Sequence, residues 1–120
     1  MNQQQGVISL ADIFKSFSRT GTGTVYTVPT ADAGATPPIP PTTALVKSIR
    51  LSNQSGGTVA TTVTAMDYSN SSLEVEFYKD NLADGSTEEM LTQPITLMQQ
   101  DAIKLTGAGV KILISLMEIS

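Results

Sequence analysis

The sequence predicts an all-β fold, an antiparallel β-sandwich of immunoglobulin-like or jelly-roll type. Short runs of β-branched and aliphatic residues recur along the chain, separated by Gly, Asn, Asp or Pro. Apolar and polar side chains alternate strictly over Leu73–Asp80, which indicates a strand with one buried and one exposed face. Only 15% of the residues are charged, which suits hydroxyl-rich sheets more than helices. Both sandwich topologies fit this pattern.

Residues 1–22 are predicted to form a short amphipathic helical arm in front of a sandwich domain of residues 23–120. Ser9–Asp12 fits a weak capping box, and apolar residues then recur at i, i+3, i+4 and i+7. About two helical turns are not stable alone, so the apolar face must dock on its own domain or on a neighbouring subunit. Two glycines within residues 19–23 favour the arm, and removal of residues 1–22 should then leave a folded domain that no longer binds its partner. The docking face comprises Leu10, Ile13, Phe14 and Phe17.

The middle of the chain is predicted to contain one strand, one stiff connection and one hairpin. The strand spans residues 24–28 and stops at Pro29. Five of the six prolines lie between residues 29 and 41, which predicts a rigid irregular segment. Leu45–Met66 then holds two β-type runs around Gly56-Gly57, the pattern of a β-hairpin.

The last third of the chain is predicted to hold short strands at residues 88–91, 95–98 and 102–106 and a long closing strand, Val110–Ile119. Alternation gives this closing strand two apolar faces, and a strand that is apolar on both faces is usually covered on both. We therefore expect a partner on its outer face. The inner face comprises Val110, Ile112, Ile114 and Leu116, and the outer face comprises Leu113, Met117 and Ile119.

The composition argues against an enzyme and against a nucleic-acid partner. The chain has no Cys, His or Trp, so it lacks the commonest general base, thiolate and imidazole metal ligands, and the usual activators of a serine nucleophile. A net charge of −4 opposes the binding of phosphates. No run reaches the length of a membrane span, and no secretory signal is recognisable. We expect no cofactor, no metal and no membrane partner.

Paired carboxylates are the remaining candidates for catalysis. Glu74 and Glu76 lie two apart on one strand face, a spacing that could serve glycoside hydrolysis or ligate calcium. Asp84, Glu88 and Glu89 form a second acidic group. Neither group has nearby apolar pocket residues that would raise the pKa of one carboxylate, and nothing resembles a calcium-binding loop. A solvated sheet face explains these residues better.

Four segments carry a resemblance to a known group of proteins: Val25–Pro29, Ala44–Asn53, the Gly56-Gly57 turn and the closing Leu116–Ser120. Taken together over about residues 24–120, they resemble small β-sandwich virion structural proteins of tailed bacteriophages. The resemblance implies a protein that is assembled in the cytoplasm of a bacterial host and resides in the virion. The proline-rich insert and the acidic stretch after residue 73 depart from that group, which leaves the position within the particle open.

These observations lead to a first hypothesis and two alternatives. The first is a non-enzymatic capsid decoration (cement) protein that forms a homo-oligomer and contacts the major capsid protein or the neck and tail proteins. The same module could instead belong to the neck, the tail or a fibre. A third reading is a carbohydrate-binding module for the host surface, with Tyr68 or Tyr78 as a stacking platform, although aromatic residues make up only 5% of the chain.

Overall fold

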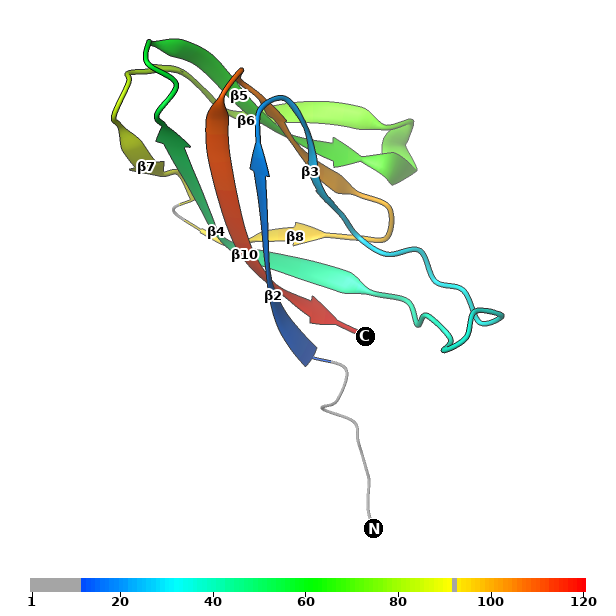
Figure 1. Cartoon of the computed structure of the whole chain (residues 1–120). Coiled ribbons are helices and arrows are strands. Elements are labelled where there is room, and N and C mark those ends of the chain that lie inside the picture. Colours follow the sequence, from blue (N-terminus) through cyan, green and yellow to red (C-terminus); the bar gives the residue numbers. More distant parts are fainter. Residues whose placement is uncertain (1–11, 92) are drawn as a thin grey trace.

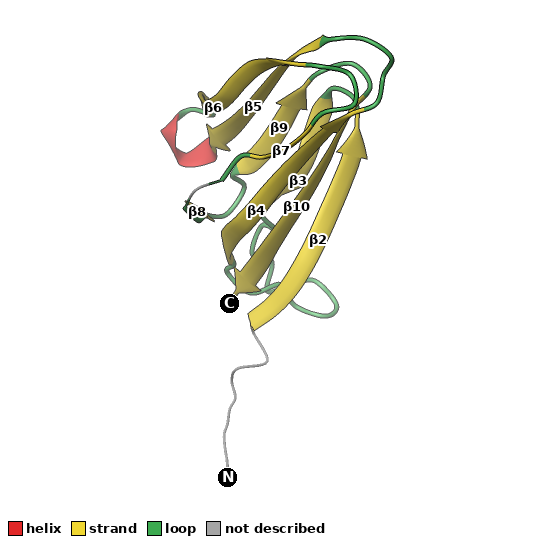
Figure 2. Ribbon diagram, turned by 90° about the vertical axis from the view of Figure 1, so that its left-hand side faces the viewer, coloured by secondary structure: helices red, strands yellow, loops and turns green. Residues whose placement is uncertain are grey.

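The computed structural model describes residues 12–91 and 93–120, which form two antiparallel β-sheets packed face to face (Figure 1; Figure 2). The elements are β2 (Asp12–Thr20), β3 (Gly23–Thr27), β4 (Thr43–Asn53), β5 (Val59–Asp67), the 3-10 turn η2 (Tyr68–Asn70), β6 (Leu73–Leu82), β7 (Thr87–Glu89), β8 (Ile95–Leu97), β9 (Ala102–Thr106) and β10 (Val110–Ile119). The predicted sandwich is confirmed.

The strand order identifies the sandwich as a jelly roll. Sheet I has five strands in the order β2-β10-β4-β7, with β8 also paired to β4, and sheet II has four strands in the order β3-β9-β5-β6. The chain changes sheet between β2 and β3, β3 and β4, β4 and β5, β6 and β7, β8 and β9, and β9 and β10. Each sheet is therefore assembled from strands that are distant in sequence.

The core lies between the sheets and is built by alternation along the long strands. In β10, residues 110, 112, 114, 116 and 118 are buried, whereas those between them face outward, as the sequence predicts for the first four. Strand β4 adds buried side chains beside those of β10, and β5 and β9 supply the opposing ones from sheet II. The largest fully buried side chains are Ile49, Leu51, Leu82, Ile103, Leu105, Ile112, Ile114 and Leu116.

The predicted hairpin at Leu45–Met66 is wrong, although both of its strands exist. Strand β4 pairs with β10, β7 and β8 in sheet I, and β5 pairs with β6 and β9 in sheet II. Residues 54–58 therefore cross between the sheets. This arrangement turns the apolar faces of β4 and β5 toward each other, whereas a hairpin would direct both to the same side. A glycine-containing turn between two β-type runs occurs in both geometries, so the local pattern does not distinguish them.

The crossing is held by Asn53, whose side chain is fully buried. Its Nδ2 donates to the carbonyl oxygens of Gly57, at 2.8 Å, and Leu82, at 2.7 Å. Its Oδ1 accepts from the backbone N–H of Ser55 at 3.0 Å. One amide side chain thus replaces the backbone pairing that is lost where the chain leaves the sheet.

The predicted helical arm is also wrong within the described residues, because Asp12–Thr20 is a strand of sheet I. It pairs with β10 in an unbroken register from Asp12 opposite Ile119 to Thr20 opposite Lys111. The predicted boundary at residue 22 therefore does not separate an arm from the sandwich there. An unpaired β10 edge offers hydrogen-bond partners that outweigh a weak local helical pattern. The part of the arm before residue 12 lies outside the described residues.

The predicted strand Leu73–Asp80 is present as β6, but the side chain of Tyr78 lies on the other face of the strand from the one predicted. Its register with β5 shifts between Val63 and Thr64, so that Val63 lies opposite Tyr78 and Thr64 opposite Glu76. Phe77 is the extra residue of this bulge, and Tyr78 therefore lies on the inner face, not the predicted outer one. The other predicted strands occur within one or two residues of their expected bounds.

Candidate interaction surface

The outward face of sheet I carries a cluster of large apolar side chains among serines and cations, whereas the outward face of sheet II is polar. Outward positions on sheet I include Leu113 and Ile119, which are 44% and 37% exposed, and the half-buried Met117. On sheet II the corresponding central positions are Thr62 and Thr64 on β5, which lie opposite Thr106 and Lys104 on β9. The apolar face of sheet I is therefore the candidate interaction surface.

Cross-strand register arranges this surface in rows. Met117 on β10 lies opposite Phe14 on β2 and opposite Leu45 on β4, which makes an apolar row across three strands. Directly opposite side chains share a face in antiparallel pairs. Phe14 is 71% exposed, the largest exposure among the exposed large apolar side chains of the described residues.

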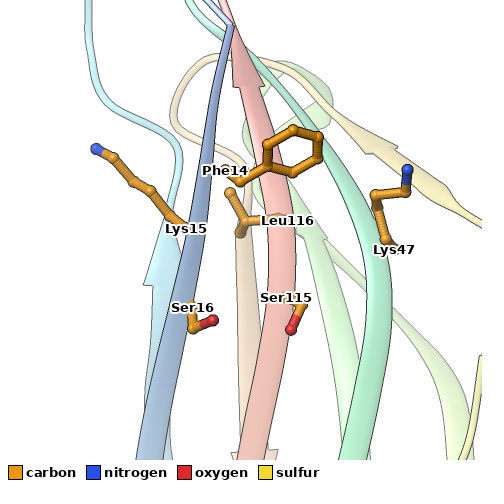
Figure 3. Close-up of a pocket in the computed structure, with 6 residues that line it drawn as sticks. All are labelled: Phe14, Lys15, Ser16, Lys47, Ser115 and Leu116. Atoms are coloured by element: carbon orange, nitrogen blue, oxygen red, sulfur yellow. The ribbon is translucent and has the colours of Figure 1, made fainter.

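A row of three serines follows the apolar row, because Ser115 lies opposite both Ser16 and Ser48. The β10–β4 register shifts next to Ser115, and a hollow of about 260 Å³ opens there (Figure 3). The Phe14 side chain extends from β2 across β10 toward Lys47 of β4, and the Lys47 Nζ lies 5.8 Å from the centre of the Phe14 ring. The surface thus has a small hollow of mixed polar and apolar lining and a cation near an aromatic ring.

The charges on this surface are mainly positive although the chain as a whole carries −4. Lys47, Arg50 and Lys111 occupy outward or exposed positions on β4 and β10. Among them, Arg50 pairs with Glu89 at 3.0 Å. The surface therefore complements a partner that combines apolar and acidic groups.

The structure separates the residues of the predicted docking face. Alternation along β2 places Phe14 on the outer face, whereas Ile13 and Phe17 lie opposite the inward-facing Glu118 and Ile114. Phe17 is half-buried, with its ring 4.7 Å from that of Tyr26, and Ile13 is 48% exposed. Leu10 lies outside the described residues.

Leu113, Met117 and Ile119 do lie together on the outward face of β10, as predicted. Phe14 joins them, and so do Leu45 and Lys47, which alternation along the closing strand does not indicate. A period of two over residues 13–19 separates Phe14 from Ile13 and Phe17, whereas the helical spacing of 3.6 residues places all three on one face. Only the pairing of β2 with β10 brings Phe14 beside the β10 residues.

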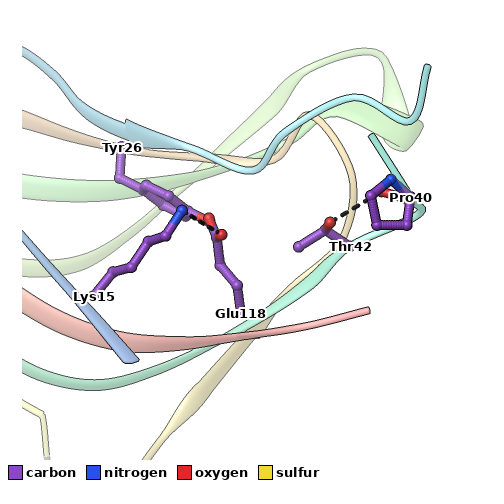
Figure 4. Close-up of polar contacts among 5 residues, drawn as sticks. All are labelled: Lys15, Tyr26, Pro40, Thr42 and Glu118. Carbon is purple, nitrogen blue, oxygen red and sulfur yellow. Dashed lines mark hydrogen bonds and ion pairs between the residues drawn. The ribbon is translucent and has the colours of Figure 1, made fainter. Parts of the chain in front are cut away.

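The buried carboxylate of Glu118 on β10 binds one residue of β2, in the same sheet, and one residue of β3, in the opposite sheet (Figure 4). Glu118, 7% exposed, lies between Lys15 of β2 and Tyr26 of β3. Its Oε1 is 2.8 Å from the Lys15 Nζ, and its Oε2 accepts a hydrogen bond of 2.6 Å from the Tyr26 hydroxyl. No pattern in the sequence predicts this group, because its members come from three strands.

These contacts control the protonation of the group. Burial by itself raises the pKa of Glu118, but hydrogen bonds from Lys15 and Tyr26 outweigh it and hold this pKa below its usual value. Burial, followed by the hydrogen bond to Glu118, raises the pKa of Tyr26. At neutral pH the carboxylate is charged and the phenol is neutral, so the bridge is intact.

Glu118→Gln is expected to lower the free energy of unfolding at neutral pH by about 1 to 2 kcal/mol, because the ion pair is lost and Lys15 is only partly exposed. A depressed folded pKa means that the wild-type advantage is present above the ordinary value of 4.5 and disappears as the pH falls through the folded pKa. Denaturant unfolding of both proteins across this range measures the difference. Glu74→Gln, in an exposed pair with Lys104, is the control and should change stability by less than about 0.5 kcal/mol. A Glu118→Gln cost that persists at the lowest pH would contradict the assignment.

The carboxylates considered for catalysis do not converge on one site. Glu74 pairs with Lys104 at 2.9 Å on the outer face of sheet II, and within the described residues no three Asp or Glu side chains gather closely enough to hold a metal ion. Burial, together with a hydrogen bond to Glu88, raises the pKa of Tyr78 to about 12. Of the two tyrosines considered for sugar stacking, Tyr78 is thus half-buried and engaged, while Tyr68 is 48% exposed.

Residues 12–91 and 93–120 include no helix with the length and hydropathy of a membrane-spanning segment.

Comparisons with known proteins show no family for this chain. No protein-family model matches the chain, and no curated protein matches it. Among solved structures, the chain is similar to one from work on Bacillus endospore appendages, described as a novel family of disulfide-linked pili. The match has a TM-score of 0.46 and 13% sequence identity, and it covers 91% of this chain and 86% of the other.

Proposed function

We propose that this protein is a non-enzymatic structural subunit of a virion, a capsid decoration protein of a tailed bacteriophage that docks on the particle through the outer face of sheet I. The observation that carries the proposal is the apolar row of Phe14, Met117 and Leu45 with Leu113 and Ile119 beside it. A second apolar face on a sandwich that already has a core calls for a protein partner.

Burial of these apolar side chains would supply enough binding free energy for stable attachment to the particle. Each large apolar side chain that becomes fully buried contributes about 1.5 to 3 kcal/mol before the costs of association. Three or four such anchors, repeated by symmetry over a shell, bind cooperatively even when each subunit binds weakly. The surrounding cations, Lys47 and Lys111, favour a lattice protein that presents carboxylates around an apolar centre.

The fold and the resemblance support a particle component more than a catalyst. The β-sandwich agrees with the type of protein that residues 24–120 resemble. Copies would reside in the virion after assembly in the bacterial cytoplasm, as homo-oligomers in contact with the major capsid protein. The polar outer face of sheet II, with Thr62 and Thr64 at its centre, would then face solvent.

The Leu113→Asp/Met117→Asp double variant is expected to keep the fold and lose particle binding. Both side chains point outward, so the core is unchanged. In the complex with the particle, two apolar side chains that would be buried at the interface are replaced by charged ones. Binding should weaken by at least about a hundredfold, since each anchor is worth a factor of ten or more. Co-sedimentation with purified particles that lack the protein measures it.

Thr62→Asp/Thr64→Asp is the matched control, because it places the same two charges on the outer face of sheet II. It should bind particles as the wild type does. The proposal is wrong if the wild-type protein does not bind particles, or if the Leu113→Asp/Met117→Asp variant decorates them at full occupancy.

A further inference from the structure

The free edges of the two sheets differ in how well they are protected. Sheet I ends on one side in β7 and β8, which have three residues each, too short to serve as a template. Sheet II ends in β3, which has five residues and a register shift between Thr24 and Tyr26. Its other edge, β6, carries Glu74, Glu76, Lys79 and Asp80 and a bulge. Charges, bulges and short length are the features that keep edge strands from pairing.

Within the described residues, strand β2 is the remaining edge; it is long and has no bulge, and its cations Lys15 and Arg19 are both engaged within the subunit. It has nine residues, DIFKSFSRT, without Gly or Pro, and its register against β10 is continuous. Its inward cation, Lys15, is neutralised by Glu118 of the same subunit. Its other cation, Arg19, is folded back onto the following turn, where it donates to the carbonyl oxygens of Gly21 and Thr22. The outer side of β2 therefore presents an unbroken row of backbone donors and acceptors.

We infer that β2 pairs antiparallel with β2 of a second copy about a two-fold axis at Ser16, which joins two copies of sheet I into one continuous sheet. The inference specifies the self-association in the proposed function and rests on that function for its biological setting. Its occupant is a second copy, because β2 paired with itself about this axis matches all nine residues in length and register.

The side chains complement one another in this register. Antiparallel pairing about Ser16 places Phe14, which is 71% exposed, opposite the partner subunit's Ser18, a small side chain on the same outer face. On the inner side, Lys15 lies opposite the partner subunit's Phe17 and Ile13 opposite the partner subunit's Arg19. No like charges are directly opposed, and every outward side chain meets an outward one.

The pairing also enlarges the candidate interaction surface. The row of Phe14, Met117 and Leu45 from each copy lies on the same side of the joined sheet, related by the two-fold axis. A lattice protein would then meet two symmetric apolar rows separated by serines. Attachment through two rows strengthens binding without any new contact type.

Cysteine substitution tests the axis, because the natural chain has no cysteine. A short thiol-specific bifunctional reagent should link Ser16→Cys to its own copy, because these positions face each other about 5 Å apart. Phe14→Cys should link to Ser18→Cys in a mixture of differently tagged chains but not to itself, since two copies of position 14 lie about 13 Å apart. Ser48→Cys, on β4, is the control that should remain unlinked. Equal linking of Ser48→Cys, or none of Ser16→Cys, overturns the inference.

Charge substitution tests the same β2–β2 contact without a cross-linking reagent. Ser16 is exposed on the outer face, so Ser16→Glu leaves the subunit folded but places two like charges opposite each other. Sedimentation equilibrium should give a mass of two chains for the wild type and a dimer dissociation constant raised about fivefold or more for Ser16→Glu. A mixture of Ser16→Glu with Ser16→Lys should restore pairing as a heterodimer. A monomeric wild type, or no preference for the heterodimer, contradicts the inference.

These outcomes are distinct from those that test the proposed function. A monomer that binds particles through Leu113 and Met117 would disprove β2 pairing and leave the decoration role intact. A β2-paired dimer that binds no particle would disprove the decoration role and leave β2 pairing intact.

Discussion

A chain that starts at residue 23 is expected to be unfolded or aggregated, whereas the predicted arm-and-domain organisation would leave it folded. The deletion removes all of β2 and its nine pairs with β10. It also uncovers Tyr26, which loses the Phe17 ring, and leaves Glu118 buried without Lys15. Losses of this size approach the whole stability of a small domain, about 5 to 15 kcal/mol. Circular dichroism and denaturant unfolding measure the result.

Complementation separates loss of β2 from general damage. A peptide of residues 12–20 should restore cooperative unfolding to the truncated chain, because it can occupy the vacant β10 edge. The same peptide with Lys15→Glu should restore less, since it places a second carboxylate beside Glu118. A truncated chain that unfolds with the wild-type midpoint would show that β2 is dispensable.

Asn53→Ala is expected to cost about 2 to 4 kcal/mol of unfolding free energy. The substitution leaves the buried Leu82 carbonyl without its donor and releases the loop carbonyl of Gly57 and the N–H of Ser55. Each buried polar group left unsatisfied costs about 1 to 3 kcal/mol. Denaturant unfolding monitored by tyrosine fluorescence measures the loss.

Asn81→Ala is the matched control, because Asn81 is exposed on the edge strand β6. Its effect should stay within about 0.5 kcal/mol. If both alanine variants lose the same stability, the crossing between the sheets does not depend on the Asn53 side chain.

The strands could be predicted from the sequence because alternation is a local signal. Residues 73–80, 102–106 and 110–119 each show it, and each is a strand in the structure. The pairing of strands could not be predicted in this way. A turn such as residues 54–58 looks alike in a hairpin and in a crossing, and only the demand that both apolar faces share one core selects the crossing.

The interaction surface could be predicted in part for the same reason. Leu113, Met117 and Ile119 share a face by alternation alone, whichever strands flank them. The helical spacing groups Phe14 with Ile13 and Phe17. As a strand paired with β10, residues 12–20 place Phe14 on the opposite face from these two residues. The bridge of Lys15, Glu118 and Tyr26 depends on the neighbours that tertiary structure brings together, so no local pattern indicates it.

Cryo-electron microscopy of purified particles tests the central claim most directly. The proposal predicts many symmetry-related copies of the sandwich on the particle, with Met117 and Leu113 against the lattice protein and β5 toward solvent. Absence of the protein from the particles, or copies whose sheet I faces solvent, would contradict it.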